Sequence, residues 1–298
     1  MADDHDEQEP VNVEVARIKM KKWRDEGYRN SEEIVDFGGC LLIEHANKLG
    51  DEVWVVYEQV CVAAFDCCRL DLAEECINAL QKQFPNSTRV LRLKGMLYEA
   101  AQAYPLAEQL YDRILKDDPA NLQIRKRKIA ILKAQNRITD TIRALNMYLK
   151  EFMGDQDAWM ELAELYIQHL EYSKAAFCLE ELILSHPHNH LYHQRYAEIQ
   201  YTIGTPDATE KARKYFSQAL KLDPNNVRAL YGLFLTTSTS VNSKASKGTS
   251  KISNSKLSEW SAQQIADTFD MNVSDSQLKT LDAMFKDMQL SLPATSAE

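Results

Sequence analysis

Apolar residues recur along the middle of the chain with the spacing of paired amphipathic helices. In the clearest stretch the first helix carries them at i, i+3 and i+7, on one face; these are Trp159, Leu162 and Tyr166. A second helix follows with the spacing i, i+4 and i+7, at Ala175, Leu179 and Leu182. Pro187 then ends the unit, because proline cannot continue a helix. The pattern predicts two helices joined by a short turn.

The same pattern returns every 34 residues. Pro85 and Pro119 lie 34 apart, and one unit repeats the offsets at Gly95, Tyr98, Ala107, Tyr111 and Ile114. The unit between these two is degenerate, and beyond residue 187 the step becomes 37, with three residues inserted near residues 204–207. Five units share the register. A period of 34 with two antiparallel helices per unit is typical of tetratricopeptide repeats, so we predict an all-α solenoid, a right-handed superhelix of antiparallel helix pairs.

Small residues mark where the two helices of a unit cross. Ala163 and Ala175 occupy these positions in the clearest unit. Small side chains permit interaxial distances of about 8–10 Å. We therefore expect a close crossing there that does not tolerate larger side chains.

Composition divides the chain into five segments. We expect an acidic disordered tail (1–11), the repeat array (12–235), a flexible Ser/Thr/Lys-rich loop (236–256), C-terminal capping helices (257–290) and a disordered tail (291–298). The capping helices would cover the last repeat with their apolar residues. These are Trp260, Ile265, Phe269, Leu278, Leu281, Met284, Phe285 and Met288.

Charge and apolar content narrow the function. The net charge of −9 over 298 residues disfavours non-specific binding of nucleic acid. No apolar stretch reaches the length of a membrane span, and the acidic first ten residues do not resemble a signal peptide. Six cysteines without a C-x-x-C pair suit a reducing compartment. We expect a soluble or peripheral protein on the cytosolic side.

Two motifs offer alternatives to a plain scaffold. The histidines of SHPHNHLYH could bind zinc or copper or could simply occupy the turn around Pro187; they are His186, His188, His190 and His193. The basic run Arg125, Lys126, Arg127, Lys128 could be a nuclear signal or phosphate-binding patch, or a solvated helix face with local acidic contacts. We favour the structural interpretation of both, and expect no metal site and no cofactor.

Nothing in the sequence indicates catalysis. There is no nucleophile–base constellation, phosphate loop or dinucleotide fingerprint, and the paired acids at residues 74–75 and 180–181 point apart on helices. We expect a protein that is not an enzyme.

The array should bind proteins on the inner face of its first helices. That face takes the second, fifth, ninth and twelfth positions of each unit, which are Arg89, Arg92, Met96, Glu99, Gln123, Lys126, Ala130, Lys133, Asp157, Met160, Glu164 and Ile167. The candidate protein-binding residues among them are Arg89, Arg92, Met96, Lys126, Lys133, Asp157, Met160 and Glu164. We expect a groove that is basic at one end and acidic with apolar patches at the other.

Several stretches resemble subunit 2 of the endoplasmic reticulum (ER) membrane protein complex. They include GDEVWVVYEQV at 50–60, QLYDRILKDDP at 109–119, GDQDAWMELAELYI at 154–167 and YSKAAFCLEELILSHPHNHLY at 172–192. The resemblance continues through RKYFSQALKL and RALYGL and covers roughly residues 15–235.

That resemblance implies a peripheral scaffold on the cytosolic face of the ER membrane. It would be part of an insertase for tail-anchored and multipass proteins. Its partners would be cytosolic segments of membrane subunits and a neighbouring soluble subunit, with no nucleic acid and no membrane span of its own.

Two other functions stay open. A co-chaperone that captures acidic chaperone tails would carry Lys at a fifth position and Asn at a ninth. The fifth positions here are Glu58, Arg92, Lys126 and Met160, and the ninth are Val62, Met96, Ala130 and Glu164. The absence of Asn argues against such a clamp. An RNA-processing scaffold is disfavoured by the net charge.

Overall fold

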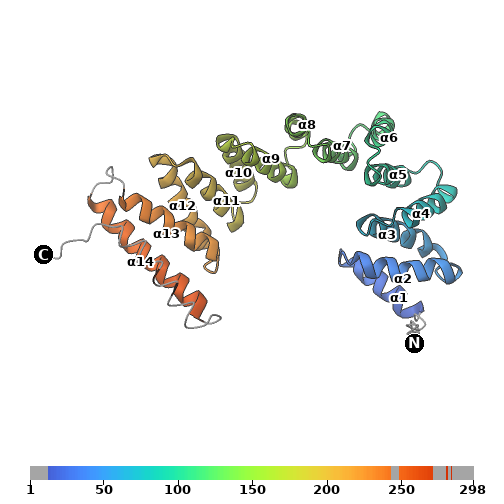
Figure 1. Ribbon diagram of the computed structural model, residues 1–298, viewed down its shortest axis with the longest axis horizontal. Helices are drawn as coiled ribbons and strands as arrows, with labels where there is room; N and C mark the ends of the chain where they lie inside the picture. Colours follow the sequence, from blue (N-terminus) through green and yellow to red (C-terminus); the bar gives the residue numbers. More distant parts are fainter. Residues whose placement is uncertain (1–12, 243–247, 271–279, 281–282, 284–298) are drawn as a thin grey trace, which may run out of the picture. The chain divides into compact units, whose positions relative to one another are not determined.

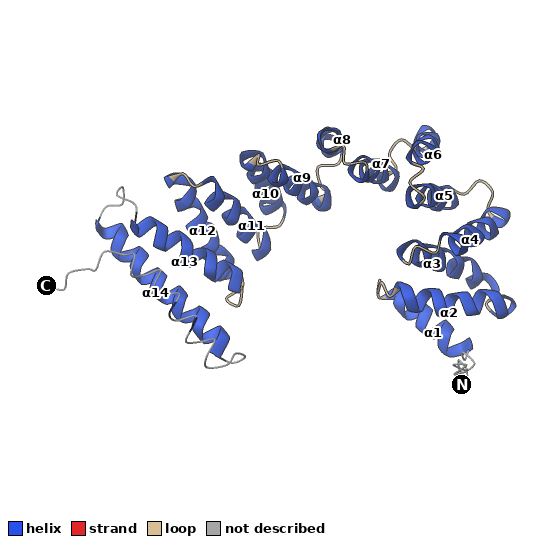
Figure 2. Ribbon diagram, in the orientation of Figure 1, coloured by secondary structure: helices blue, strands red, loops and turns tan. Residues whose placement is uncertain are grey.

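The computed structural model describes residues 13–242 and 248–270, together with 280 and 283. Every regular element in that part of the chain is a helix (Figure 2). The first are α1 (Val13–Asp25), α2 (Ser31–Glu44), two 3-10 turns (Ala46–Lys48 and Gly50–Glu52), α3 (Val53–Asp66), α4 (Leu70–Gln83), α5 (Thr88–Ala100), α6 (Tyr104–Asp117) and α7 (Leu122–Ala134). Figure 1 labels all the helices.

The remaining helices follow after residue 137. They are α8 (Ile138–Glu151), α9 (Gln156–Gln168), α10 (Tyr172–Ser185), α11 (His190–Ile203), α12 (Pro206–Leu222), α13 (Val227–Asn242) and α14 (Gly248–Asp270). The chain divides into two compact units, Met1–Arg137 and Ile138–Glu298, called unit 1 and unit 2 below. The tetratricopeptide-repeat solenoid expected from the sequence is the observed fold.

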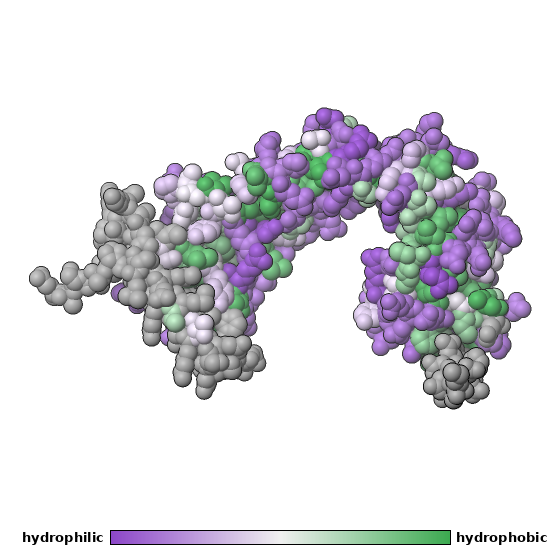
Figure 3. Space-filling view, viewed as in Figure 1, coloured by the Kyte–Doolittle hydropathy of each residue, from purple (hydrophilic) through white to green (hydrophobic). Residues whose placement is uncertain are grey.

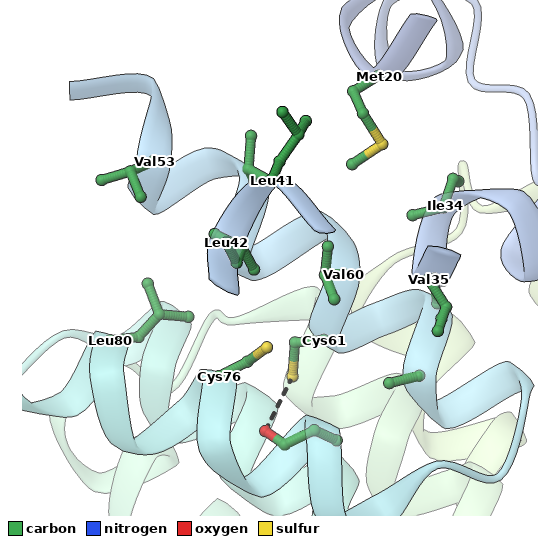
Figure 4. Close-up of a cluster of buried hydrophobic side chains, with 14 of the residues drawn as sticks. Met20, Ile34, Val35, Leu41, Leu42, Val53, Val60, Cys61, Cys76 and Leu80 are labelled. Carbon is green, nitrogen blue, oxygen red and sulfur yellow. Dashed lines mark hydrogen bonds between the residues drawn. The ribbon is translucent and has the colours of Figure 1, made fainter. Parts of the chain in front are cut away.

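The largest core cluster lies in unit 1 and joins α1 through α5. Met20, Leu41, Val60 and Cys76 point into it from four different helices (Figure 4). The Cys61 thiol donates a long hydrogen bond of 3.8 Å to the carbonyl oxygen of Ala73, where α3 and α4 approach each other. Buried apolar side chains from neighbouring helices therefore form one packed core in this part of the array.

Small residues also set the helix crossings. Ala163 and Ala175 are buried between α9 and α10, as expected. In unit 1 the corresponding position is Gly95, where an added Cβ would lie 2.3 Å from the Tyr111 ring. The side chain on the second helix thus fills the space that the missing Cβ leaves.

The turn between the two helices of a repeat uses one residue in the left-handed conformation. These residues have φ between 57° and 72° and are spaced by 34; they are Cys68, Gln102, Asn136, Leu170 and Gly204. In the first four, the amide one residue further on bonds back to the preceding helix, as Glu171 N does to Tyr166 O at 2.9 Å, which is a Schellman-type cap. The period holds through the degenerate repeat, and the three inserted residues come after Gly204.

A flexible loop was expected at residues 236–256, but the structure has helix in most of this segment. Residues 236–242 continue α13 and residues 248–256 begin α14, while 243–247 lie outside the described residues. The Thr236 and Thr237 hydroxyls donate to carbonyls three and four residues back, at 2.8–2.9 Å, so their polar groups are satisfied inside the helix. Their small side chains are fully buried. A Ser/Thr-rich sequence therefore forms a packed helix here.

The C-terminal cap is partly described. α14 packs against α13, and Ile265 is fully buried with Leu230 and Phe234. Trp260 does not join this core: its side chain is 47% exposed. The side chain of Phe269 and the expected cap residues Leu278, Leu281, Met284, Phe285 and Met288 lie outside what the structure describes, as do the tails at 1–12 and 291–298.

Candidate protein-binding surfaces

Unit 1 carries a groove of about 900 Å³ on the inner faces of α3, α5 and α7, with the α1–α2 turn at one edge. Here it is called the unit 1 groove. Its α3 wall includes Val55, Glu58, Val62 and Phe65, which are the second, fifth, ninth and twelfth positions of the repeat before the one that contains Arg89. Met96, Arg89 and Ala130 also line it. The four α3 residues lie 34 positions before Arg89, Arg92, Met96 and Glu99, so they follow the same inner-face register.

The centre of the unit 1 groove is apolar. Val55 and Val62 are apolar and lie on α3, whose other face is buried in the core, yet each is more than a third exposed. Exposed apolar side chains in a concave surface are typical of binding sites. The chemistry of this centre suits an aliphatic or aromatic side chain of a partner.

Ion pairs within the chain edge this apolar centre. The Glu58 carboxylate accepts hydrogen bonds from Arg89 at 2.5 Å and from Arg92 at 3.2 Å. Arg92 also donates to Gln123 and is only 23% exposed. Both arginines are candidate protein-binding residues at the expected basic end of the groove, and the structure pairs both with Glu58. Glu58 occupies the equivalent position one repeat before Arg92, so these ion pairs join neighbouring repeats.

Glu99 links the groove to the core. It accepts a hydrogen bond from the hydroxyl of buried Tyr111 and a second from Arg127 at 3.1 Å. Burial raises the pKa of Tyr111, and the bond to Glu99 raises it further, so the phenol stays protonated and donates. Arg127 lines the groove. Lys126 and Lys133 are exposed on α7 but are not among the lining residues.

The basic run on α7 makes mainly local contacts. Arg125 donates to the Pro119 carbonyl at 2.8 Å, Arg127 to Glu99, and Lys128 to Asp112 at 2.5 Å. These contacts agree with the interpretation of the basic run as a helix face with local contacts to acidic and main-chain groups.

The predicted acidic half of the inner face lies in unit 2. Asp157 is exposed, and Met160 and Glu164 are half-buried on α9. Glu164 accepts from Arg195 at 2.7 Å, and Arg195 and Arg228 share Glu198 at 3.1 and 2.5 Å. None of the three predicted residues lines the neighbouring groove of about 380 Å³ between α11 and α13, here the unit 2 groove.

The unit 2 groove has an aromatic lining that the sequence analysis did not identify. Tyr172, Tyr201 and Tyr231 surround Ile199 and Leu235. Tyr201 is the twelfth position of α11 and Tyr231 is the fifth position of α13, so both lie at inner-face positions of repeats that follow those named in the sequence.

The histidine run is dispersed among separate contacts. His186 bonds to Gln156, His190 to Asn226, and His193 to the Pro187 carbonyl at 2.8 Å. Within the described residues no group of three or more His, Cys, Asp or Glu side chains could hold a metal ion.

The buried cysteines lie in apolar surroundings. Burial raises the pKa of Cys76 and of Cys178 to about 12. Both thiols are therefore protonated near neutral pH and pack as small apolar groups.

A helical-repeat solenoid with exposed inner grooves defines a protein-binding scaffold of the tetratricopeptide class. The same fold occurs in the crystal structure of the C-terminal part of a TPR repeat-containing protein from Cytophaga hutchinsonii. That similarity has a TM-score of 0.57 at 13% identity and covers 91% of this chain and 99% of the other. It supports the fold alone.

Sequence comparisons identify the family. The family description "EMC2 TPR-like repeat domain" matches residues 71–221. ER membrane protein complex subunit 2-A of Xenopus laevis is 50% identical over 285 residues, which cover 94% of this chain and 96% of the relative. The Dictyostelium discoideum subunit 2 is 31% identical over 85% of this chain and 82% of its own length. The chain belongs to the family of ER membrane protein complex subunit 2.

Among the described residues, no helix combines the length and apolar character needed to cross a membrane.

Proposed function

We propose that this protein is a non-catalytic scaffold subunit of the ER membrane protein complex, positioned on the cytosolic face of the membrane. In this role it holds cytosolic segments of membrane subunits beside a soluble subunit. The complex so assembled inserts tail-anchored proteins and segments of multipass proteins. The family membership supports the complex, and the resemblance noted in the sequence supports the insertase role.

The unit 1 groove is the observation that carries the scaffold role. Its apolar centre at Val55, Val62 and Met96 is edged by arginines that Glu58 and Glu99 already pair. A partner segment gains most of its binding free energy by burying an apolar side chain in this centre. Main-chain and polar groups of the segment then meet the charged edge, which fixes its register.

Affinity purification in mild detergent tests this function directly. Full-length chain should co-purify ER membrane subunits, whereas Val62→Ser combined with Met96→Ser should lose most of the yield because the apolar anchor site is gone. Leu106→Ser is the matched control, since Leu106 is 50% exposed on α6 outside the groove. Recovery of soluble chaperones alone would favour a co-chaperone. If the double variant co-purifies the membrane subunits at the same yield as the Leu106→Ser control, the partner does not bind in this groove.

The charged edge of the groove is a poor place for a test. Replacing Arg92 with an acidic residue would place a second carboxylate beside Glu58, at a half-buried position within the chain. A loss of binding could then reflect a local folding defect.

A further inference from the structure

The outer side of α10 presents apolar side chains to solvent. Phe177 is 53% exposed and Leu184 is 76% exposed, seven residues apart on one face. That face is opposite to the buried Ala175, Leu179 and Leu182 that hold α10 to its neighbours. Figure 3 shows hydrophobic residues over α9 and α10 among hydrophilic ones. The sequence pattern of the repeat does not require them, because these are solvent positions.

A groove of about 260 Å³ adjoins this face, between α10 and the start of α12. Phe177 and Glu180 form its α10 side, and Ile203, Asp207 and Lys211 lie across from them. Phe177, Glu180, Leu184, Ile203 and Asp207 are together called the α10 outer surface below. It lies entirely in unit 2 and is separate from both inner grooves.

Two of its side chains are held in place. The Phe177 ring meets Trp159 edge-on, with ring centroids 6.2 Å apart. The Glu180 carboxylate accepts a hydrogen bond of 2.7 Å from the buried Tyr196 hydroxyl. A partner would therefore meet an aromatic face and a carboxylate whose conformational entropy has already been restricted, which lowers the cost of binding.

The charge around this surface selects the partner. Two carboxylates, Glu180 and Asp207, line the groove beside this surface, against one lysine, Lys211. Glu181 lies between Phe177 and Leu184 on α10, and Asp207 stands in the first turn of α12. By contrast α7 has five basic residues and no acid. A cationic segment is attracted to α10, and an acidic segment is repelled from it.

We propose that the α10 outer surface binds a Lys/Arg-rich amphipathic helix from the cytosolic flank of a membrane-spanning segment. Its leucine-type side chains pack on Phe177 and Leu184 at helical spacing, and its basic groups meet Glu180 and Asp207. Cytosolic flanks of membrane proteins are enriched in Lys and Arg, so the source of such a helix rests on the proposed scaffold function. The surface is a second contact, independent of the inner grooves.

Peptide binding to the full-length protein tests the chemistry. The probe is a fluorescent 18-residue helical peptide with leucines on one face and lysines flanking them, measured by anisotropy. It should bind, and its affinity should fall with added salt. Two companion peptides, with Glu replacing Lys or Ser replacing Leu, should bind at least about tenfold more weakly, a difference of about 1.4 kcal/mol.

Variants locate the binding. Leu184→Ser combined with Asp207→Asn should weaken the lysine peptide about tenfold, whereas Leu106→Ser on α6 should leave it unchanged. Circular dichroism and melting curves check that each variant folds. Wild-type affinity in the double variant, or equal binding of the glutamate peptide, would overturn the proposal.

A crosslinking experiment in cells separates this proposal from the scaffold function. A photo-reactive benzoylphenylalanine replaces Leu184 in the full chain, and co-purifying proteins are identified. Crosslinks to basic flanks of membrane subunits support the proposal. Co-purification of those subunits without such crosslinks overturns it and leaves the scaffold function standing. Loss of co-purification in the folded photo-reactive variant alone would show that this surface is needed for binding and would support the proposal. Failure of the unsubstituted chain to co-purify those subunits would count against the scaffold function.

Discussion

The inner grooves of the two units share an ion-pair pattern, one glutamate between two arginines, but differ in the side chains that line them. In unit 1 the nearly buried Glu58 binds one half-buried arginine, Arg92, and one exposed arginine, Arg89. In unit 2 Glu198 binds half-buried Arg195 and exposed Arg228 in the same way. Each carboxylate side chain is about a fifth exposed, at 20% and 19%. One carboxylate between two guanidiniums therefore recurs on the inner face of both units.

The difference lies in the size and polarity of the neighbouring side chains. Val55, Val62, Met96 and Ala130 line the unit 1 groove of about 900 Å³, whereas Tyr172, Tyr201 and Tyr231 line the unit 2 groove of about 380 Å³. The repeat thus supplies a common frame with a common charge pattern. The residues at the inner positions then decide how large a partner group each groove admits.

Overpacking a helix crossing should give the largest effect on stability. Ala175→Leu adds three carbons where α9 and α10 are in contact, and should cost roughly 1–3 kcal/mol of unfolding free energy. Urea denaturation followed by circular dichroism measures it. Leu184→Ala, at an exposed position on the same helix, is the control and should change stability by less than about 0.5 kcal/mol. An unchanged midpoint for Ala175→Leu would show that the crossing is looser than the burial indicates.

The shared carboxylates can be tested in parallel. Glu58→Gln and Glu198→Gln each remove a charge between two guanidiniums and should each cost about 1 kcal/mol, less than a fully buried ion pair because both arginine partners are partly exposed. Denaturation of each variant gives the two values. Similar losses of unfolding free energy would support the same role for the two carboxylates, and a loss in one unit alone would contradict it.

The repeated left-handed turn offers a stabilising change. Leu170 adopts φ 60° and is 71% exposed, while the equivalent Gly204 adopts the same conformation without a Cβ. Leu170→Gly should relieve strain at the expense of greater freedom in the unfolded chain, for a net gain of about 0.5–1 kcal/mol. Gly204→Ala should lose stability. Melting temperatures that move in the opposite directions would contradict the conformation assigned to these turns.

Acid sensitivity should give the smallest effect. Hydrogen bonds from Arg29 hold the pKa of Asp66 below its ordinary 3.8 in unit 1, and Arg213 holds that of Glu210 below 4.5 in unit 2. A depressed carboxyl pKa contributes stability that is full above the unfolded-state pKa and is lost as the pH falls through the folded-state value. Stability should therefore decline below about pH 4.5, and less steeply in Asp66→Asn and Glu210→Gln. If stability falls equally steeply with pH in the wild type and in both variants, these two ion pairs do not contribute to the acid sensitivity.

The 34-residue pattern predicted more than the helices. It placed Ala163 and Ala175 at a buried crossing, and its inner-face positions reappear as the α3 wall of the unit 1 groove. The left-handed turn residues keep the same period even where the apolar pattern fades. These features depend on spacing along one helix pair, which a single sequence contains.

The partners of individual side chains were not predictable in the same way. Arg89 and Arg92 looked like cations available to a partner, because no acidic residue lies three or four positions from either of them in α5. Glu58 reaches them from the helix of the preceding repeat. Residues 236–256 looked like a flexible loop because Ser and Thr compete with helix formation in isolation. The structure makes most of this segment helical, and at its start the buried hydroxyls of Thr236 and Thr237 donate to carbonyl oxygens four residues earlier in the same helix.

The sequence by itself determined the repeat, its register and the family, because these rest on local periodicity and on residues shared along the chain. Only the tertiary structure decided which charges are neutralised, how much of each inner face stays open, and which apolar side chains remain exposed on α10. Those properties depend on contacts between residues about 30 positions apart, such as Glu58 with Arg89 and Glu198 with Arg228. The physical reason is that the free energy of a charged or apolar side chain is set by what surrounds it in space, and neighbouring repeats supply most of those surroundings.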